Sequence, residues 1–212
     1  MDSGKSCNRN SRLEYIMKYK NVVFDFGNVI GRFDGNYILE QFCPSKEDQN
    51  ILYPVIFKNW AELDRGTVDY EKNALAAEAE VPDRLKPVVR RFFHDWPSYV
   101  LPMEETYSLI RELKGKGYGL YLLSNAATHF AEWAANLDIL KEFDGIVFSA
   151  PVRMAKPDAE IYQYLFQKYH LRPEECLFID DLEQNIRAAK ALGMDGILFT
   201  GDTDAVRKIL EE

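Results

Sequence analysis

The stretch NVVFDFGNVI, residues 21–30, decides the fold of this chain. Its apolar run VVF, residues 22–24, is β-branched and aromatic, and it predicts a buried strand. The run ends at Asp25, and a carboxylate in that position costs free energy unless another group compensates it. Gly27 and Asn28 follow, and both residue types tolerate tight turns close to a ligand. Asp25 is therefore either a catalytic nucleophile or a cap of a helix or turn.

Length and composition set the broad class of the protein. The chain has 212 residues, of which 47% are hydrophobic, so we expect one domain or a domain with a small insert. It contains no run of eighteen or more apolar residues, so we expect no membrane span. The net charge of −8 argues against a nucleic-acid surface, because phosphate backbones favour clustered Lys and Arg. A small phosphorylated substrate needs only local positive charge or a metal.

The cysteines and the N-terminal segment indicate the cellular compartment that we expect for the protein. Cys7, Cys43 and Cys176 are far apart and match neither a CxxC motif nor a zinc-site spacing. A reducing, cytoplasmic compartment is the simple expectation. Residues 1–17 are polar and lack the hydrophobic segment of a secretory signal. We expect them to be a disordered leader, with the compact domain beginning near residue 18.

Residues 34–101 predict a helical insert after the first strand. Helical segments alternate there with breaks at proline and glycine residues, and no strand signal intervenes. The expected helices are NYILEQF (36–42), EDQNILYPVIFKNWAEL (47–63), VDYEKNALAAEAE (68–80) and DRLKPVVRRFFHDW (83–96). We expect this insert to form a small helical subdomain, with residues 18–33 and 102–212 forming the core.

From residue 102 onward, predicted helices and strands alternate. The expected helices are 103–117, 128–137, 159–169, 183–193 and 204–212, and the expected strands are 120–123, 145–149, 176–179 and 196–200. Strands separated by helices of this length pair in parallel through crossover connections. The sequence therefore predicts an α/β fold with a doubly wound parallel sheet.

Polar side chains follow three of the predicted strands. Asp25 ends the first, Ser124 and Asn125 end another, and Asp180 and Asp181 end a third. The carboxyl ends of parallel strands lie at one edge of the sheet, where ligands bind. Three carboxylates at one edge repel one another unless a cation lies between them, and all-oxygen ligation suits Mg²⁺. This coincidence favours a functional site over separate caps.

The residue types at this edge suit phosphoryl transfer. A bound Mg²⁺ would neutralise phosphate oxygens and leave a carboxylate free to attack. The Ser124 hydroxyl and nearby backbone N–H groups could hold the transferring group. Lys156 could add positive charge that stabilises both the phosphate and the ionised nucleophile. Carboxylate nucleophiles that form acyl-phosphates are a known means of phosphoryl transfer, which supports Asp25 as the nucleophile.

These stretches resemble the four motifs of the haloacid dehalogenase-like (HAD) hydrolase superfamily, in the family's order. They are DFGNV (25–29), LLSN (122–125), KPD (156–158) and FIDDLEQNIRAAKALGM (178–194). The resemblance covers about residues 20–200, and it implies a Rossmann-like core. The insert after the first motif resembles the family's helical type-one cap, which closes over the active site and selects the substrate.

The resemblance also implies a role for each motif residue. Asp25 falls on the nucleophile that becomes an aspartyl-phosphate. Ser124 and Asn125 fall on the positions that bind the phosphoryl group in the family, Asn125 through its backbone N–H. Lys156 falls on the lysine that balances the charge of the site.

For the metal, the resemblance implies a Mg²⁺ ion held by oxygen atoms. Asp181 falls on the principal acidic ligand, and Asp25 is also a ligand. The backbone carbonyl of Gly27 takes the place of the family's backbone ligand. Asp180 occupies a variable position and could help through a water molecule.

Gly27 departs from the family pattern. Most family phosphatases carry a second Asp there as general acid and base, a function worth roughly 10²–10⁴-fold in rate. Either the rate is poor, or another group or water does that work, or the leaving group needs little help. DFGNV, the helical insert and AKPD (155–158) together resemble the α-glucose-1-phosphatase-like branch of the family, which also has Gly at this position. The resemblance therefore favours a sugar phosphate as substrate.

Two other functions remain open. A 2-haloacid dehalogenase would use the same nucleophile without a metal, but the paired acids Asp180 and Asp181 argue for phosphoryl transfer. A non-catalytic binding module could have kept the scaffold, and the missing acid at Gly27 is its best support. We expect a small phosphorylated substrate, no nucleic-acid or membrane partner, and a monomer or weak homodimer.

A few further residues are candidates for contact with the site. Trp60, Asp64 and Arg65 lie near a break between predicted helices of the insert and could face the substrate. Asn185 is expected to steady the metal-binding acids from behind. His129 lies just after the second motif and is a weaker candidate.

Overall fold

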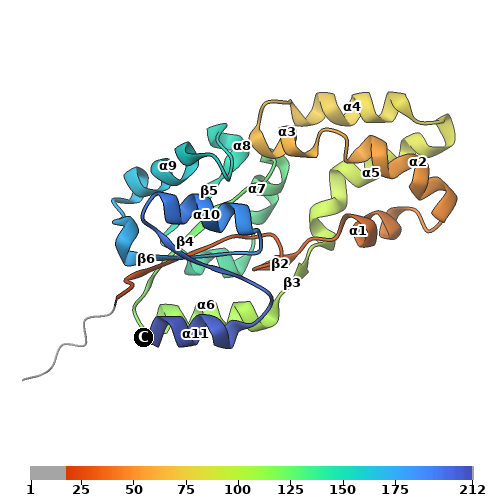
Figure 1. Cartoon of the computed structure of the whole chain (residues 1–212). Helices are drawn as coiled ribbons and strands as arrows, with labels where there is room; N and C mark the ends of the chain where they lie inside the picture. Colours follow the sequence, from red (N-terminus) through yellow and green to blue (C-terminus); the bar gives the residue numbers. More distant parts are fainter. Residues whose placement is uncertain (1–17, 212) are drawn as a thin grey trace, which may run out of the picture.

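The computed structural model describes residues 18–211, and its centre is a five-stranded parallel sheet (Figure 1). The strands lie in the order β5-β4-β1-β6-β7. Their bounds are β1 (Asn21–Phe24), β4 (Gly119–Ser124), β5 (Gly145–Phe148), β6 (Cys176–Asp180) and β7 (Asp195–Leu198). From β1 the chain adds strands first on one side and then on the other, so β1 is the topological switch point where such sheets bind ligands. The predicted doubly wound α/β fold is confirmed.

Helices cover both faces of the sheet because successive side chains of a strand point to opposite faces. Val22 and Phe24 pack in one apolar cluster with α6 (Glu104–Gly115) and α11 (Thr203–Glu211). Val23 packs in a second cluster. The helices of that second face are α9 (Ala159–Tyr169) and α10 (Glu183–Ala191). The remaining elements near the sheet are α7 (Thr128–Ala134), η3 (Asp138–Glu142), α8 (Ser149–Val152) and η4 (Pro173–Glu175).

A second group of helices lies beside the sheet, at the right of Figure 1. We call residues 35–99 the helical insert. Its elements are α1 (Gly35–Phe42), α2 (Lys46–Ile56), α3 (Trp60–Arg65), α4 (Tyr70–Glu80), η1 (Asp83–Leu85), α5 (Lys86–Asp95) and η2 (Trp96–Tyr99). The chain enters and leaves it through β2 (Gly31–Arg32) and β3 (Leu101–Pro102), which pair antiparallel. This pairing holds the two connections side by side.

Two local expectations were wrong. The segment 47–63 was expected to be one helix, but α2 ends at Ile56 and α3 begins at Trp60. The ring of Phe57, in the break, packs on Trp60 at a centroid distance of 4.9 Å, so tertiary packing of aromatic side chains accompanies the turn. The β2–β3 pair was missed because strands of two residues are too short to produce an alternating pattern.

Some predictions concern residues that the structure does not describe. The polar leader, residues 1–17, and Cys7 within it lie outside the described residues. Cys43 and Cys176 are buried free cysteines. Within residues 18–211, none of the helices combines the length and the apolar character needed to cross a membrane.

Candidate active site

The strand register brings the ends of β1, β4 and β6 together. Phe24 of β1 lies opposite Leu122 of β4 and Ile179 of β6, so the residues that follow these three converge. The backbone N–H of Asp25 continues the ladder by donating to the Ile179 carbonyl at 2.9 Å. A pocket of about 320 Å³ opens at this edge. It is lined by the predicted residues Asp25, Gly27, Ser124, Asn125, Lys156 and Asp181, and by Asn185.

Lys156 joins two of the strand ends electrostatically. Its Nζ lies 2.8 Å from Asp25 Oδ1 and 2.6 Å from Asp180 Oδ2, and its side chain is only 1% exposed. Burial lowers the pKa of Lys156, but the charges of Asp25 and Asp180 outweigh burial and raise that pKa above its ordinary value. Lys156 is therefore a permanent cation beside the candidate nucleophile.

Asp180 lies behind the pocket, where its carboxylate is saturated with hydrogen bonds. Besides Lys156, it accepts the Leu182 backbone N–H at 2.8 Å and the Asn185 side-chain amide at 2.9 and 3.0 Å. It is fully buried. These contacts orient Lys156 toward Asp25, and they leave few lone pairs of Asp180 for another ligand.

Asp25 is the buried acid that faces the pocket. Burial raises its pKa to about 7, the charge of Lys156 opposes this rise, and the charge of Asp180 adds to it. The backbone N–H of Phe26 also donates to Asp25 Oδ1 at 2.7 Å. A second cation at the carboxylate would favour the ionised form that a nucleophile needs.

The residues of this edge fit a hydrated magnesium ion. Carboxylate oxygens of Asp25, Asp180 and Asp181 lie within 4.8 Å of one another. Asn185 Oδ1 is buried and lacks a hydrogen-bond partner among the described residues, although its amide nitrogen is bonded to Asp180. Asn28, whose φ of 53° follows from a tight turn, donates to Asp181 Oδ2 at 3.1 Å. Oxygen donors plus an unused acceptor suit Mg²⁺, which keeps several of its waters.

The second motif provides one free polar group and one structural one. The Asn125 amide donates to the Lys156 carbonyl and accepts from the Lys156 N–H, both at 2.8 Å. Its side chain therefore fixes the loop that carries Lys156, which leaves the backbone N–H as its possible contact with phosphate. The Ser124 hydroxyl has only a long contact, 3.5 Å to the Asn125 carbonyl, and it is available to a ligand.

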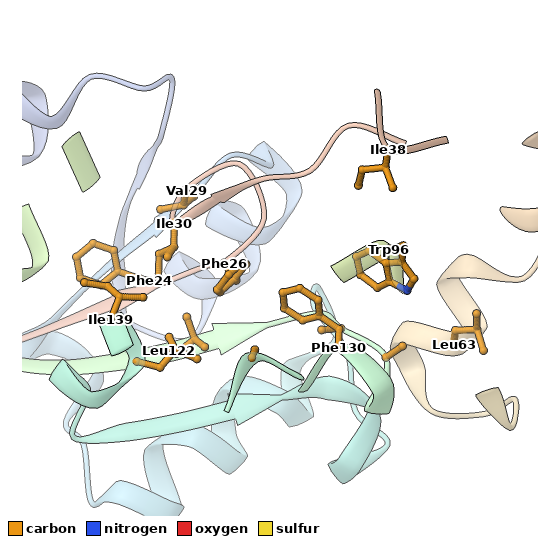
Figure 2. Packing of buried hydrophobic residues seen from close by; sticks show 14 of the residues in the cluster. Phe24, Phe26, Val29, Ile30, Ile38, Leu63, Trp96, Leu122, Phe130 and Ile139 are labelled. Atoms are coloured by element: carbon orange, nitrogen blue, oxygen red, sulfur yellow. The ribbon is translucent and has the colours of Figure 1, made fainter. Parts of the chain in front are cut away.

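An apolar wall faces these polar groups. Aromatic rings follow one another from the core to the insert. Phe26 lies 5.0 Å from Phe130 and Phe130 lies 5.3 Å from Trp96, between ring centroids (Figure 2). Trp96 in turn lies 5.1 Å from Trp60. Phe33, Val100 and Leu182 also line the pocket. Sequence reasoning missed most of this wall, because isolated aromatic residues on separate elements carry no common motif.

Among the candidate residues from the insert and just after the second motif, two line the pocket and two do not. Trp60 and Asp64, both on α3, line the pocket as expected. Arg65 instead pairs with Asp158 at 2.5 Å. His129 stacks on the ring of Tyr70 and is absent from the pocket lining.

Comparison with known proteins identifies the family of this chain. The chain belongs to the haloacid dehalogenase-like hydrolases, whose family model matches residues 19–193. It is 28% identical over 188 residues to a sesquiterpene phosphatase of Aspergillus oryzae, covering 86% of this chain and 90% of that protein. It is 27% identical over 197 residues to a D-ribitol-5-phosphate phosphatase of Bacteroides thetaiotaomicron, covering 83% and 89%.

A solved structure shares the fold. A HAD family enzyme from Bacteroides thetaiotaomicron, in complex with magnesium and inorganic phosphate, matches with a TM-score of 0.68 and 22% identity. The match covers 89% of this chain and 98% of that one. The chain is thus a HAD-family hydrolase with phosphatases among its relatives.

Proposed function

We propose that this hydrolase is a Mg²⁺-dependent phosphatase that acts on a small phosphate monoester through an aspartyl-phosphate on Asp25. The observation that carries the proposal is the buried Lys156 bridge between Asp25 and Asp180 beside a free Ser124 hydroxyl. A buried cation next to a carboxylate and a hydroxyl is suited to a phosphoryl group, because it balances charge without blocking attack.

Each residue then has a defined task. Asp25 attacks phosphorus with the carboxylate oxygen that is not held by Lys156. Ser124 and the Asn125 backbone N–H hold the phosphoryl oxygens, while Lys156 balances their charge. A bound Mg²⁺ supplies further neutralisation of the phosphate oxygens. Asp25, Asp181 and the Gly27 carbonyl would hold that ion. Asp180 is already hydrogen-bonded to Lys156 and Asn185, so we favour a role in which it positions these two side chains and does not bind the ion directly.

The helical insert is proposed to act as the cap that selects the substrate. The earlier expectation of a sugar phosphate stays a prediction, and the lining of the pocket supports a second class. The Asn28 amide is occupied by Asp181 and by the Phe33 backbone, and the Trp96 N–H is occupied by Tyr70. Among the described residues of the lining, few polar side chains remain beyond those assigned to the phosphate and the ion, so we favour the phosphate ester of an apolar alcohol. The relative that is named as a sesquiterpene phosphatase supports this class.

Hydrolysis assays separate these functions. We expect release of phosphate from p-nitrophenyl phosphate in the presence of Mg²⁺, and we expect Asp25→Asn to lower the rate by at least about 10³-fold because the nucleophile is lost. Hexyl phosphate should give a higher kcat/KM than glucose 1-phosphate. Asp138→Asn, a change at an exposed surface pair, is the matched control and should leave the rate unchanged.

Three other outcomes of these assays would contradict the proposed function. An unchanged rate in Asp25→Asn would refute the phosphatase mechanism. Halide release from chloroacetate without phosphatase activity would favour a dehalogenase. Inactivity toward both kinds of substrate would favour a binding module that kept the scaffold.

A further inference from the structure

The glycine at position 27 leaves one step of the proposed reaction without a proton donor. When phosphoryl moves from an alkyl ester to Asp25, the ester oxygen needs a proton, and a positioned donor is worth roughly 10²–10⁴-fold. Gly27 has no side chain to give it. A positioned side-chain donor would therefore have to come from another residue at the pocket, an inference that rests on the phosphatase proposal above.

Carboxyl groups that line the pocket come from three described residues, Asp25, Asp64 and Asp181. The first is the proposed nucleophile and the third the proposed metal ligand, which leaves Asp64. Attacking and leaving oxygens lie roughly in line through phosphorus, so the leaving oxygen points away from Asp25. Asp25 follows β1 of the sheet, whereas Asp64 lies on α3 of the helical insert. Asp64 therefore reaches the pocket from a different element than the nucleophile does.

We propose that the Asp64 carboxyl group donates the proton to the leaving oxygen and later accepts one from the attacking water. In the first step, Asp25 forms a bond to phosphorus, the bond from phosphorus to the ester oxygen breaks, and the Asp64 proton completes the alcohol. In the second, water attacks phosphorus, its proton returns to Asp64, and the bond from phosphorus to Asp25 breaks. The sum is one ester and one water converted to one alcohol and one phosphate.

Contacts with the core fix the position of Asp64. Its backbone carbonyl accepts a hydrogen bond from the Ser149 hydroxyl, which in turn accepts the Ala126 N–H at 2.8 Å. Ala126 directly follows the phosphate-binding residues of the second motif. The neighbour Arg65 pairs with Asp158, close to Lys156 in the chain. The main chain at Asp64 is thus tied to the loops that form the phosphate site.

The electrostatic surroundings suit a donor. Burial raises the pKa of Asp64 to about 7, and the negative charge of Asp25 adds to the rise, while the Ala127 N–H and Lys156 oppose it. On α3 itself, Arg65 is engaged by Asp158 and Glu62 is exposed. A carboxyl group with this pKa is partly protonated near neutral pH, and its neutral form does not repel the phosphate.

The test compares two esters that differ in their need for a proton. We expect Asp64→Asn to lower kcat/KM for hexyl phosphate by about 10²–10⁴-fold, and for 2,4-dinitrophenyl phosphate by less than about tenfold, because dinitrophenolate leaves without a proton. The variant should also release dinitrophenolate in a burst of one equivalent, since the phosphorylated Asp25 then hydrolyses slowly. Glu62→Gln, on the exposed side of the same helix, is the matched control.

Position 27 provides a second, independent variant. A Cβ added at Gly27 meets no heavy atom within 4 Å, so Gly27→Asp should fit. We expect it to restore hexyl phosphate hydrolysis at least tenfold in Asp64→Asn. In the protein that keeps Asp64, the same substitution should give no gain of 10²-fold or more, because the donor is already present. This comparison does not require Asp64→Asn to fold.

The outcomes distinguish this inference from the phosphatase proposal. Equal losses on both esters without a burst, or no loss on either, would overturn the role of Asp64 while leaving the phosphatase intact. A gain of 10²-fold or more from Gly27→Asp alone would overturn it as well. Failure of the unaltered protein to hydrolyse either ester would refute the phosphatase proposal itself.

Discussion

At the scale of single residues, the pocket depends on how buried charges are compensated. Lys156 is 4% exposed and lies between two carboxylates, so each of the three would be unstable alone. Asp64 differs because no side-chain cation within the described residues pairs with it closely enough to keep its pKa low. The same burial makes Asp64 a donor and makes its ionised form costly to the fold.

That cost predicts how stability changes with pH. The folded-state pKa of Asp64 is raised from 3.8 to about 7, so its contribution is present below about pH 4 and is lost as pH rises through 7. We expect Asp64→Asn, which cannot ionise, to match the unaltered protein in Tm near pH 4 and to exceed it at pH 8. The upper limit of the difference is about 4 kcal/mol, since one pKa unit corresponds to about 1.4 kcal/mol.

Thermal unfolding by circular dichroism at pH 4, 6 and 8 measures this difference. Glu62→Gln serves as the control, because its exposed carboxyl group is not held in the pocket. A Tm difference that is constant with pH, or that shrinks as pH rises, would contradict the raised pKa.

At the scale of elements, the short helix α3 is positioned by its C-terminal glycine. Gly66 has a φ of 72°, in the left-handed region that favours glycine, and it closes the helix. A Cβ added there would lie 2.3 Å from the Ala150 carbonyl oxygen of α8. The close approach of the two backbones places Trp60 and Asp64 over the strand ends, and a side chain would push α3 away.

We therefore expect Gly66→Ala to damage both stability and activity. The left-handed backbone and the clash together should cost about 2 kcal/mol in the free energy of unfolding. Displacement of Asp64 should lower kcat for hexyl phosphate about tenfold or more. Urea unfolding and initial-rate assays measure the two effects.

Gly115→Ala is the matched control for this change. It lies at the end of α6 with no heavy atom within 4 Å of an added Cβ, so it should be neutral or slightly stabilising. Equal effects of the two substitutions would show that α3 does not depend on the contact at Gly66.

At the scale of the whole molecule, the pocket is made by two parts of the chain that meet. The strand ends supply charge, and the helical insert supplies Trp60, Trp96 and Asp64. The stacked pair of Phe130 from α7 and Trp96 from η2 makes the apolar surface continuous across the two parts. A substrate bound here contacts both, so insert and core act as one site.

The acidic strand ends also predict a response to Mg²⁺ that does not depend on turnover. Ion binding to the folded state should raise Tm by roughly 5–10 °C at 100 times the dissociation constant, because about 2.7 kcal/mol of binding free energy adds to stability. Asp181→Asn should reduce this shift, and Asp138→Asn should not. Differential scanning fluorimetry with and without EDTA measures it; an equal shift in Asp181→Asn would exclude Asp181 as a ligand.

The sequence by itself determined the sheet, its parallel order of helices and strands, and the polar residues at the strand ends. These follow from local patterns: apolar runs that end in Asp25, Ser124 and Asp180, with motifs of fixed spacing. Parallel strands then bring those ends to one edge without further information. The tight turn after Asp25 was also readable, because Gly27 and Asn28 signal it locally.

Only the tertiary structure decided what surrounds that edge. Three features join residues that are far apart in sequence and share no periodicity. They are the contacts of Asp180 with Lys156 and Asn185, the aromatic wall, and the placement of Asp64. The sequence marks Asp64 only as a residue near a helix break that could face the substrate, and it gives no sign of a catalytic task. Its place in the pocket lining depends on the close approach of α3 to α8 at Gly66. Burial there raises its pKa, which makes it a candidate for the acid that Gly27 lacks.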